Sequence, residues 1–415
     1  MNEPLAVDAA ESAHDVAQKL AQNYDHYDHA FALEPHEVYT ELRKGCPVGK
    51  AERYGGFYVL SRHEDVHRAY TDAATFSSFP ADTPPKPHNR KLIPFEIDPP
   101  EHLDYRRMAN PLFTPKRMNA LEGKLRAHAI ELVDDMLARR EFDFMAAFAL
   151  PFPSSAFLDL VGLPADPAVR DDLVRWTMQI LHFTGAEHGT EEERDAVRNA
   201  GVGRLWPFVE SIVDDHVANP RDDVVSALIE GKLAGERPLT RLETISFVYV
   251  LVLGGLDTVT SALGWSFWHL ARRPDLRQQL IDDPSLMLGA AEEFLRFEAG
   301  VHPSRSVVAP CTLSGVDLGP GDRVVLPIVS ANRDEAVFSN PHEIDFRRNN
   351  RESLAFGAGN HKCIGIHLAR LELRVAFEEI FRRVPHFAIP DGAEMDAEGG
   401  ATRVLTALPF RIVDP

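Results

Sequence analysis

The sequence predicts a mainly helical fold in which long helices and a few short strands form one large unit. From about Pro100 to Pro274, apolar residues recur at spacings of three and four, as on the buried face of a helix. Short β-like runs are interleaved with the helical stretches, with no internal repeat and no evident linker. We therefore expect a single domain over residues 1–415, for which 44% hydrophobic residues supply a sizeable core.

The first hundred residues carry less regular patterns. Residues 1–35 are polar and are expected to be a loosely held lead-in. Residues 55–60 predict a short strand after a glycine turn, and residues 64–72 predict a helix. Residues 76–100 contain seven prolines and predict a long irregular loop, a kind of segment that often acts as a lid or binding segment.

The remaining elements follow from periodicity and turn residues. Asp166 before Pro167 is typical of an N-cap and a first helical position. A turn at residues 320–322 separates two β-like runs, and a third β-like run lies near the end of the chain. The predicted helices are residues 101–110, 118–139, 167–183, 191–218, 241–272 and 364 to about 382, and the β-like runs are residues 312–318, 323–327 and 404–413.

Composition excludes several classes of protein. A formal net charge of −19 argues against nucleic-acid binding, which needs basic surface. Cys46, Cys311 and Cys363 are widely spaced and form no CxxC pair, which suits a reducing cytosol rather than a disulfide framework. The N-terminus lacks a signal-peptide pattern, and the most apolar stretch, residues 245–256, is shorter than the ~20 residues of a bilayer span. We expect a soluble, cytoplasmic protein.

The residues around Cys363 form the most informative stretch. Glycines and an asparagine precede the cysteine, and a periodic helix follows it, so the sulfur is expected at a helix N-terminus after a bend. The helix dipole and unpaired N–H groups at such a position favour a thiolate. The thiolate would serve either as a nucleophile, with His361 as a nearby base, or as a metal ligand, and the spacing alone does not separate the two.

The longest predicted helix carries Gly254, Gly255, Asp257 and Thr258 at its centre. Two glycines inside a helix each cost roughly 1 kcal/mol against Ala, and an apolar helix has little use for an acid. Such local conflicts often mark a functional site, and the glycines would let the helix open into a wider turn. The alternative is a glycine pair that allows close helix packing, with Thr258 bonding back to its own helix.

Together these two segments resemble the cytochrome P450 family. Its haem-binding signature places Phe, Gly, His, Cys and Gly in a fixed order, and the matching positions here are Phe356, Gly359, His361, Cys363 and Gly365. The resemblance implies the fold of that family, with a long central helix over the haem and a smaller β-rich region. It also implies haem b as the cofactor and Cys363 as the axial ligand to its iron.

The resemblance assigns roles to further residues. The central helix carries the family's oxygen-activation motif, in which Thr258 assists O2 activation and Asp257 relays protons from solvent. The presence of both argues for O2 rather than peroxide as oxidant. The residues implied to contact the haem or its propionates are His102, Arg106, Gly254, Arg305, Phe356, Gly357, His361 and Gly365.

An acid and two arginines are implied to hold the cysteine loop. Glu293 and Arg296 are i,i+3 neighbours on one helix and can pair. In the family such a pair is buried and joins a third arginine before the haem loop. Arg348 matches that position, and Arg347 is the near alternative.

For the substrate, the resemblance is strongest to bacterial camphor-type hydroxylases, and it implies a pocket lined by Leu92, Ile93, Val250, Leu253, Val301 and Thr402. The camphor enzyme has a tyrosine shortly before its Phe-Ile-Pro, where this chain has Arg90. Camphor is therefore not the expected substrate. Arg90 or Lys91 would meet a substrate carboxylate or, alternatively, only solvent.

The predicted function is a monooxygenase that inserts one atom of O2 into a small or medium apolar molecule, terpenoid-like or aromatic. No flavin or nicotinamide motif is present, so a separate ferredoxin and its reductase are expected to supply electrons to a monomer. A basic patch for the ferredoxin is expected at Arg106, Arg107, Lys116, Arg117, Lys362, Arg370 and Arg374. The alternatives are oxidation of fatty acids or macrolides, a haem-binding sensor or carrier without turnover, and a cysteine hydrolase that uses Cys363 and His361.

Overall fold

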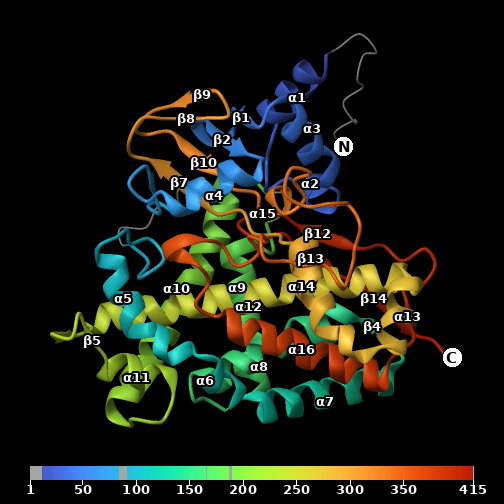
Figure 1. The fold of residues 1–415 in the computed structure, drawn as a ribbon. Coiled ribbons are helices and arrows are strands. Elements are labelled where there is room, and N and C mark those ends of the chain that lie inside the picture. Colours follow the sequence, from blue (N-terminus) through green and yellow to red (C-terminus); the bar gives the residue numbers. More distant parts are fainter. Residues whose placement is uncertain (1–11, 84–90, 165, 187–188, 415) are drawn as a thin grey trace.

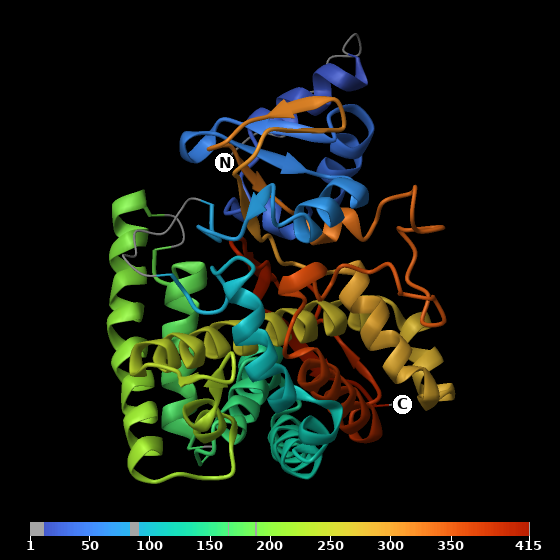
Figure 2. The same ribbon diagram turned by 60° about the vertical axis from the view of Figure 1, so that its left-hand side comes forward.

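The computed structural model describes residues 12–83, 91–164, 166–186 and 189–414. Helices dominate, which confirms the predicted fold class. Most of the long helices gather in the lower part of Figure 1, whereas the five-stranded sheet and the β8–β9 pair lie with the N-terminal helices in the upper part; the rotated view in Figure 2 shows the same two regions. The sequence alternates between these regions, because β7 to β10 return to the upper part long after β1 and β2.

Each predicted helix is present, and further helices that were not predicted lie between them. The α-helices are α1 (Ala13–Gln22), α2 (His29–Leu33), α3 (His36–Gly45), α4 (His63–Thr71), α5 (Glu101–Ala109), α6 (Pro115–Asn119), α7 (Glu122–Arg139), α8 (Pro151–Leu160), α9 (Pro167–His182), α10 (Glu191–Ala218), α11 (Val224–Glu230), α12 (Arg241–Arg272), α13 (Pro274–Asp282), α14 (Met287–Phe297), α15 (Ile328–Ala331) and α16 (Ile366–Arg383). Shorter 3-10 or π turns lie at Arg53–Gly55, Asn110–Phe113, Met145–Ala149, Pro284–Leu286 and Gly359–His361.

The strands form one five-stranded sheet and several smaller ones. The larger sheet has the order β1-β2-β10-β7-β3, in which β10 and β2 run parallel and the other neighbours run antiparallel. The strands are β1 (Val48–Ala51), β2 (Phe57–Leu60), β3 (Phe76–Ser77), β4 (Glu141–Asp143), β5 (Lys232–Leu233), β6 (Arg237–Pro238), β7 (Ser304–Val307), β8 (Cys311–Leu313), β9 (Val316–Leu318), β10 (Arg323–Val325), β11 (Phe387–Ala388), β12 (Asp396–Glu398), β13 (Val404–Ala407) and β14 (Pro409–Ile412).

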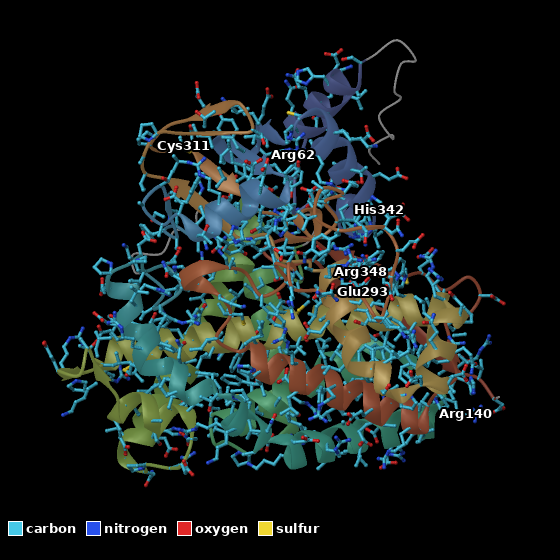
Figure 3. The ribbon with its side chains drawn as sticks, in the orientation of Figure 1. Arg62, Arg140, Glu293, Cys311, His342 and Arg348 are labelled. Atoms are coloured by element: carbon cyan, nitrogen blue, oxygen red, sulfur yellow. The ribbon has the colours of Figure 1, made fainter. Side chains whose placement is uncertain are left out.

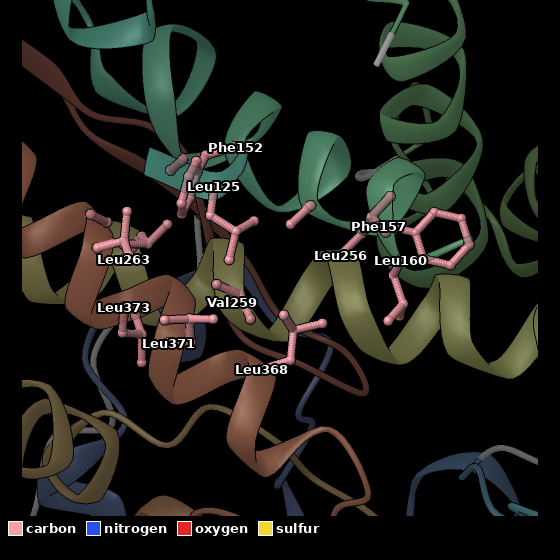
Figure 4. Packing of buried hydrophobic residues seen from close by; sticks show 14 of the residues in the cluster. Leu125, Phe152, Phe157, Leu160, Leu256, Val259, Leu263, Leu368, Leu371 and Leu373 are labelled. Carbon is pink, nitrogen blue, oxygen red and sulfur yellow. The ribbon is translucent and has the colours of Figure 1, made fainter. Parts of the chain in front are cut away.

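Helix α12 is the axis around which the helical region packs. Thr240 caps its first turn by accepting a hydrogen bond from the Glu243 N–H, and the Glu243 carboxylate accepts one from the Thr240 N–H in return. Its apolar side chains, among them Leu256, Val259 and Leu263, meet α7, α8 and α16 in one continuous core (Figure 4). Burial of this face, not helix propensity, stabilises a helix that carries two central glycines.

Helix α12 is also long and apolar enough to cross a membrane, although the apolar stretch counted in the sequence was too short. Of its most apolar 18-residue window, 61% is buried inside the protein. It is therefore the core helix of this fold, and its hydropathy is explained by contact with other helices rather than with lipid.

Several predicted helix and strand boundaries are wrong, and so is the prediction that residues 1–35 are loosely held. The lead-in is not loosely held where the structure describes it, because α1 and α2 form there and Ala17, Ala21 and Tyr24 are buried. The predicted helix at 118–139 is two helices, α6 and α7, that break near Ala120. The last helix begins two residues later than predicted, and the β-like runs at 312–318 and 404–413 are each two strands.

The proline-rich segment is irregular as predicted, apart from β3, and residues 84–90 lie outside the described residues. The buried Glu96 carboxylate accepts hydrogen bonds from the N–H groups of Ala81 and Leu92. The Ile93 N–H donates to Ser246 Oγ on α12 at 2.8 Å. The second half of the loop is thus fastened to the central helix.

Candidate active site

The cysteine loop bends sharply just before α16. Gly359 has φ 64°, and a Cβ there would lie 2.7 Å from the Tyr70 carbonyl oxygen, so only glycine fits the close approach to α4. The Cys363 N–H donates to the Phe356 carbonyl at 2.9 Å and closes the loop. Gly365 is the N-cap residue of α16, which places the cysteine two residues before the cap and three before the first helical residue.

The environment of Cys363 differs from the one expected from the sequence. Burial raises the pKa of the thiol, and this outweighs the opposite effects of the Gly365 N–H and the Arg106 guanidinium. The side chain is nevertheless accessible to a water-sized sphere. A sulfur that is deep in the fold and still accessible faces an internal space. The protein alone therefore favours the thiol, whereas coordination to a metal ion would deprotonate it.

The four residues expected to bind propionates lie together beside this loop. The rings of His102 and His361 are stacked with centroids 3.9 Å apart. Burial first, and then the positive charges of Arg305, His102 and Arg106, lower the pKa of His361 to about 2. His102 Nδ1 and His361 Nε2 are buried and have no hydrogen-bond partner among the described residues.

This cluster is a cationic site with unused donors. Arg305 is buried on β7, and its guanidinium carbon lies 5.1 Å from the centroid of the Tyr70 ring. Its NH1 group donates to its neighbour's carbonyl, Ser304 O, at 2.8 Å, and no carboxylate forms an ion pair with it among the described residues. Arg106 Nε donates to Asn110 Oδ1 at 3.0 Å. Buried cations without a matching anion are costly, so the cluster is suited to an anionic group supplied from outside the chain.

Helix α12 leaves a strip of its surface uncovered near its centre. Gly254 is exposed, and Val250, Leu253 and Thr258 are half-buried, although the helix lies in the middle of the protein. A Cβ added at Gly254 or Gly255 would meet no atom within 4 Å. The glycines therefore border open space and do not serve close helix packing, which was the alternative explanation for them.

Thr258 and Asp257 point to different environments. Thr258 Oγ1 donates to the Gly254 carbonyl of its own helix at 2.8 Å. This hydrogen bond was part of the alternative explanation of the motif, in which Thr258 bonds back to its own helix. The helix continues through the glycines without the wider turn that we expected. The Asp257 side chain is buried, and its Oδ1 lies 2.7 Å from Nε2 of His182, the last residue of α9.

Glu293, Arg296 and Arg348 meet in a buried cluster, in which Glu293 and Arg348 lie side by side (Figure 3). Arg296 donates to both Glu293 oxygens at 2.8 and 2.9 Å, and Arg348 Nε donates to Glu293 Oε1 at 3.0 Å. Arg347 instead faces Asp283 at the surface. Arg296 also donates to the Asn332 carbonyl, and Asn332 Oδ1 accepts from the Leu354 N–H at 2.7 Å, which connects the cluster to the start of the cysteine loop.

The six expected pocket residues are only partly brought together by direct contacts. Val301 and Thr402 face each other in an isolated antiparallel bridge. Leu92 and Ile93 are half-buried against the same core as Leu253. Of the two cations considered for a substrate carboxylate, Arg90 lies outside the described residues. Lys91 is exposed, with its ammonium 4.8 Å from the centroid of the Phe79 ring.

Two residues of the site were missed from the sequence. Tyr70 packs against the glycine loop and Arg305, and His182 pairs with Asp257 across 75 positions of the chain. Neither belongs to a local motif, and each acquires its role only through packing between distant elements. An isolated histidine at the end of an amphipathic helix gives no indication of its partner.

These residues fit a haem. A cysteine sulfur that faces internal space, a cationic cluster with unused histidine nitrogens, and an uncovered strip of helix are the three contacts that a flat, anionic iron porphyrin needs. Cys363 would ligate the iron, and His102, Arg106, Arg305 and His361 would hold the propionates. The cysteine-hydrolase alternative loses support, because its base would be His361. That ring is stacked on His102, and burial and the neighbouring cations lower its pKa to about 2, so that it accepts a proton poorly.

The chain is similar to known proteins in sequence and in fold. The profile described as "Cytochrome P450" matches residues 186–412. The probable cytochrome P450 127A1 of Sinorhizobium fredii (strain NBRC 101917 / NGR234) is 34% identical over 347 residues, 83% of this chain and 81% of that protein. The vitamin D(3) 25-hydroxylase of Pseudonocardia autotrophica is 29% identical, over 94% of this chain and 96% of that one. The crystal structure of CYP101J2 superposes with a TM-score of 0.84 at 27% identity and full coverage of both chains.

Replacing Glu293 with Gln should destabilise the protein and release haem. The substitution leaves the Arg296 guanidinium buried without its counter-charge, which costs about 3–5 kcal/mol for a buried pair. Urea denaturation and the haem content per chain measure the two effects.

Glu292→Gln is the matched control, because the neighbouring Glu292 pairs with Arg370 in a partly exposed position. Such a pair is worth at most about 1 kcal/mol. Equal losses of stability and haem in the two variants would show that the buried cluster has no special role in holding the loop.

Proposed function

The chain belongs to the cytochrome P450 family, and we propose that it hydroxylates a small or medium-sized apolar molecule, terpenoid-like or aromatic, with electrons from a separate ferredoxin. As a cytochrome P450 it is a monooxygenase with a haem-thiolate cofactor. The observation that carries the proposal is the joint placement of Cys363, the cationic cluster and the uncovered strip of α12.

The residues of this chain would divide the work as follows. When bound, haem supplies O2 binding and cleavage, which a thiolate ligand favours by donating electron density. Cys363 provides that thiolate, and the buried cations orient the group through its propionates. Thr258 Oγ1 would hold a proton near the uncovered strip, and the Asp257 carboxyl behind it would replace that proton.

The substrate proposal rests on the character of the pocket candidates. Leu92, Ile93, Val250, Leu253 and Val301 are apolar, and Thr402 alone offers a hydroxyl. Relatives are named for vitamin D(3), mycinamicin IV and a steroid, so larger apolar molecules such as macrolides are the second candidate. Binding would exclude water from this surface.

We also propose one domain, a cytoplasmic location and a monomeric state. We propose a narrower donor patch than the one expected from the sequence. Its arginines form ion pairs or hydrogen bonds within the protein: Arg106 with Asn110, Arg107 with Asp104, Arg117 with Asp222, Arg370 with Glu292, and Arg374 with Glu122 and Glu378. Lys116 and Lys362 are exposed, and neither has an ion pair in the described parts of the chain. These two lysines are the proposed contacts of an acidic ferredoxin.

The haem-loaded, reduced protein should show the thiolate-type Soret shift when it binds carbon monoxide, and Cys363→His should abolish it. A screen of testosterone, vitamin D(3), a terpene alcohol and 4-ethylphenol for the change from low to high spin then tests the substrate class. A protein that binds haem and carbon monoxide but consumes no NADH with any of these ligands and a donor system would be a sensor or carrier.

Reversing the charge at Lys116 and Lys362 together should slow electron transfer from a ferredoxin by about ten-fold at low salt and flatten its salt dependence. Stopped-flow reduction of the haem-loaded protein measures both quantities. Arg411→Glu is the control, because Arg411 lies on β14 beside Glu141, away from the patch. Unchanged rates in the double variant would place the donor elsewhere.

A further inference from the structure

The buried pair of His182 and Asp257 is the feature that the family resemblance does not explain. The two side chains are 0% and 1% exposed, and His182 Nε2 lies 2.7 Å from Asp257 Oδ1. They come from the last turn of α9 and the centre of α12. A buried, unpaired carboxylate would be costly, so His182 is what allows an acid to stand in this apolar helix.

The surroundings of the ring determine where its protons are. His182 Nδ1 faces the Gly399 carbonyl at 3.2 Å. A carbonyl oxygen only accepts hydrogen bonds, so Nδ1 carries a proton and donates it. The Nε2–Oδ1 contact then holds one further proton, which lies either on the histidine, as an ion pair, or on the aspartic acid, as a neutral pair.

Charge favours the ion pair at rest. Burial by itself lowers the pKa of His182, but Asp257 at hydrogen-bond distance, the Gly399 carbonyl and the more distant Glu398 together raise it. Asp257 on α12 and Glu398 on β12 are the charged groups that act on the ring. The pKa of His182 is raised, as expected for a histidine with an acidic partner. The ring therefore stays protonated at a pH where a free histidine, whose pKa is near 6.5, is mostly neutral.

The second oxygen of Asp257 is available for transfer. Asp257 Oδ2 is buried and has no hydrogen-bond partner among the described residues, and the same holds for Thr177 Oγ1 on α9. Both residues line a cavity of about 10 Å³ with Ser154 and Thr260. That volume is close to what one water molecule needs. A water there would bridge α9 and α12 next to the acid.

We propose that His182 holds the proton that Asp257 passes on, so that the two side chains act as one proton-storing unit. The N–H bond at His182 Nε2 breaks as the O–H bond at Asp257 Oδ1 forms, which leaves a neutral imidazole with its proton on Nδ1. The carboxyl group then gives a proton toward Thr258, and a proton from bulk water restores the imidazolium. One proton has moved from solvent toward the active site, and the two side chains are again an imidazolium–carboxylate ion pair.

His182 is thus a positioning and proton-holding residue, whereas Asp257 is the group that passes the proton on. This inference rests on the proposed function, but the protonation of the pair does not. Gln at position 182 can still donate a hydrogen bond to Asp257 and cannot hold a proton. His182→Gln therefore separates proton storage from simple positioning.

The chain contains a matched control. His216 on α10 and Asp223, the N-cap of α11, form a similar pair, with both side chains buried and Nε2 2.9 Å from Oδ2. His216 Nδ1 likewise faces a backbone carbonyl, Ile212 O. No residue of this second pair is among those that we place in the active site. His216→Gln therefore reports the cost of losing a buried histidine–aspartate pair as such.

The first measurement is nitrogen NMR of the histidine-labelled, haem-loaded protein, reduced and bound to carbon monoxide at pH 7. The His182 signal, assigned by its loss in His182→Gln, should show both ring nitrogens protonated, and in Asp257→Asn it should show one. A wild-type His182 with a single ring proton would overturn the proposal, whatever the protein's substrate.

The second measurement is NADH-driven O2 uptake by the haem-loaded protein with saturating ferredoxin and reductase. His182→Gln should lower the uptake about ten-fold or more, the lower range of a lost general-acid contribution, and His216→Gln should change it less than two-fold. Equal rates in the two variants would also overturn the proposal. Absence of uptake in the wild-type protein would contradict the monooxygenase function instead, and the NMR result would then decide for or against the proton-storing pair by itself.

Discussion

The buried contact of Glu293 with Arg296 and Arg348 is the constraint on which the cysteine loop depends. The carboxylate is fully buried and receives donors from both guanidinium groups and from the Asp345 N–H. The two arginines also donate hydrogen bonds to backbone carbonyls of the chain between Asn332 and Glu343. An irregular segment without strands of its own is thereby held in place, because five of its backbone carbonyls accept hydrogen bonds from the two guanidinium groups.

A short chain of hydrogen bonds connects this cluster to the cysteine. Asn332 fixes Leu354, the Leu354 carbonyl accepts from Gly357, and the Phe356 carbonyl accepts from Cys363. On the other side, α12 presents a strip that its own glycines leave uncovered. The cations from α5 and β7 complete the surroundings. Each partner comes from a different part of the chain, so the site exists only when both the helical and the strand-rich regions are folded.

The parts that sequence predicted well are those encoded by nearby residues. Helix α12 has the predicted bounds, because its apolar period, its Thr240 cap and its end are all local signals. The cysteine loop and the Glu293–Arg296 spacing are local in the same sense. The parts that sequence did not predict depend on distant contacts. His182 contacts Asp257 through the packing of α9 on α12. Four of the arginines of the expected donor patch, Arg107, Arg117, Arg370 and Arg374, form ion pairs with acids such as Glu122 on α7. The folding of residues 12–35 likewise depends on distant partners that a polar composition does not reveal. Tyr24 contacts Tyr39, and the His26 ring packs against the His302 ring.

The central claim is that the geometry around Cys363 makes it the ligand of a haem iron. Iron K-edge X-ray absorption of the purified, ferric, haem-loaded protein tests this claim most directly, since the scattering shell distinguishes sulfur from nitrogen and oxygen. We expect one sulfur scatterer in the first shell of the wild-type protein and none in Cys363→His. A wild-type protein that binds haem with only nitrogen and oxygen neighbours at the iron would contradict it.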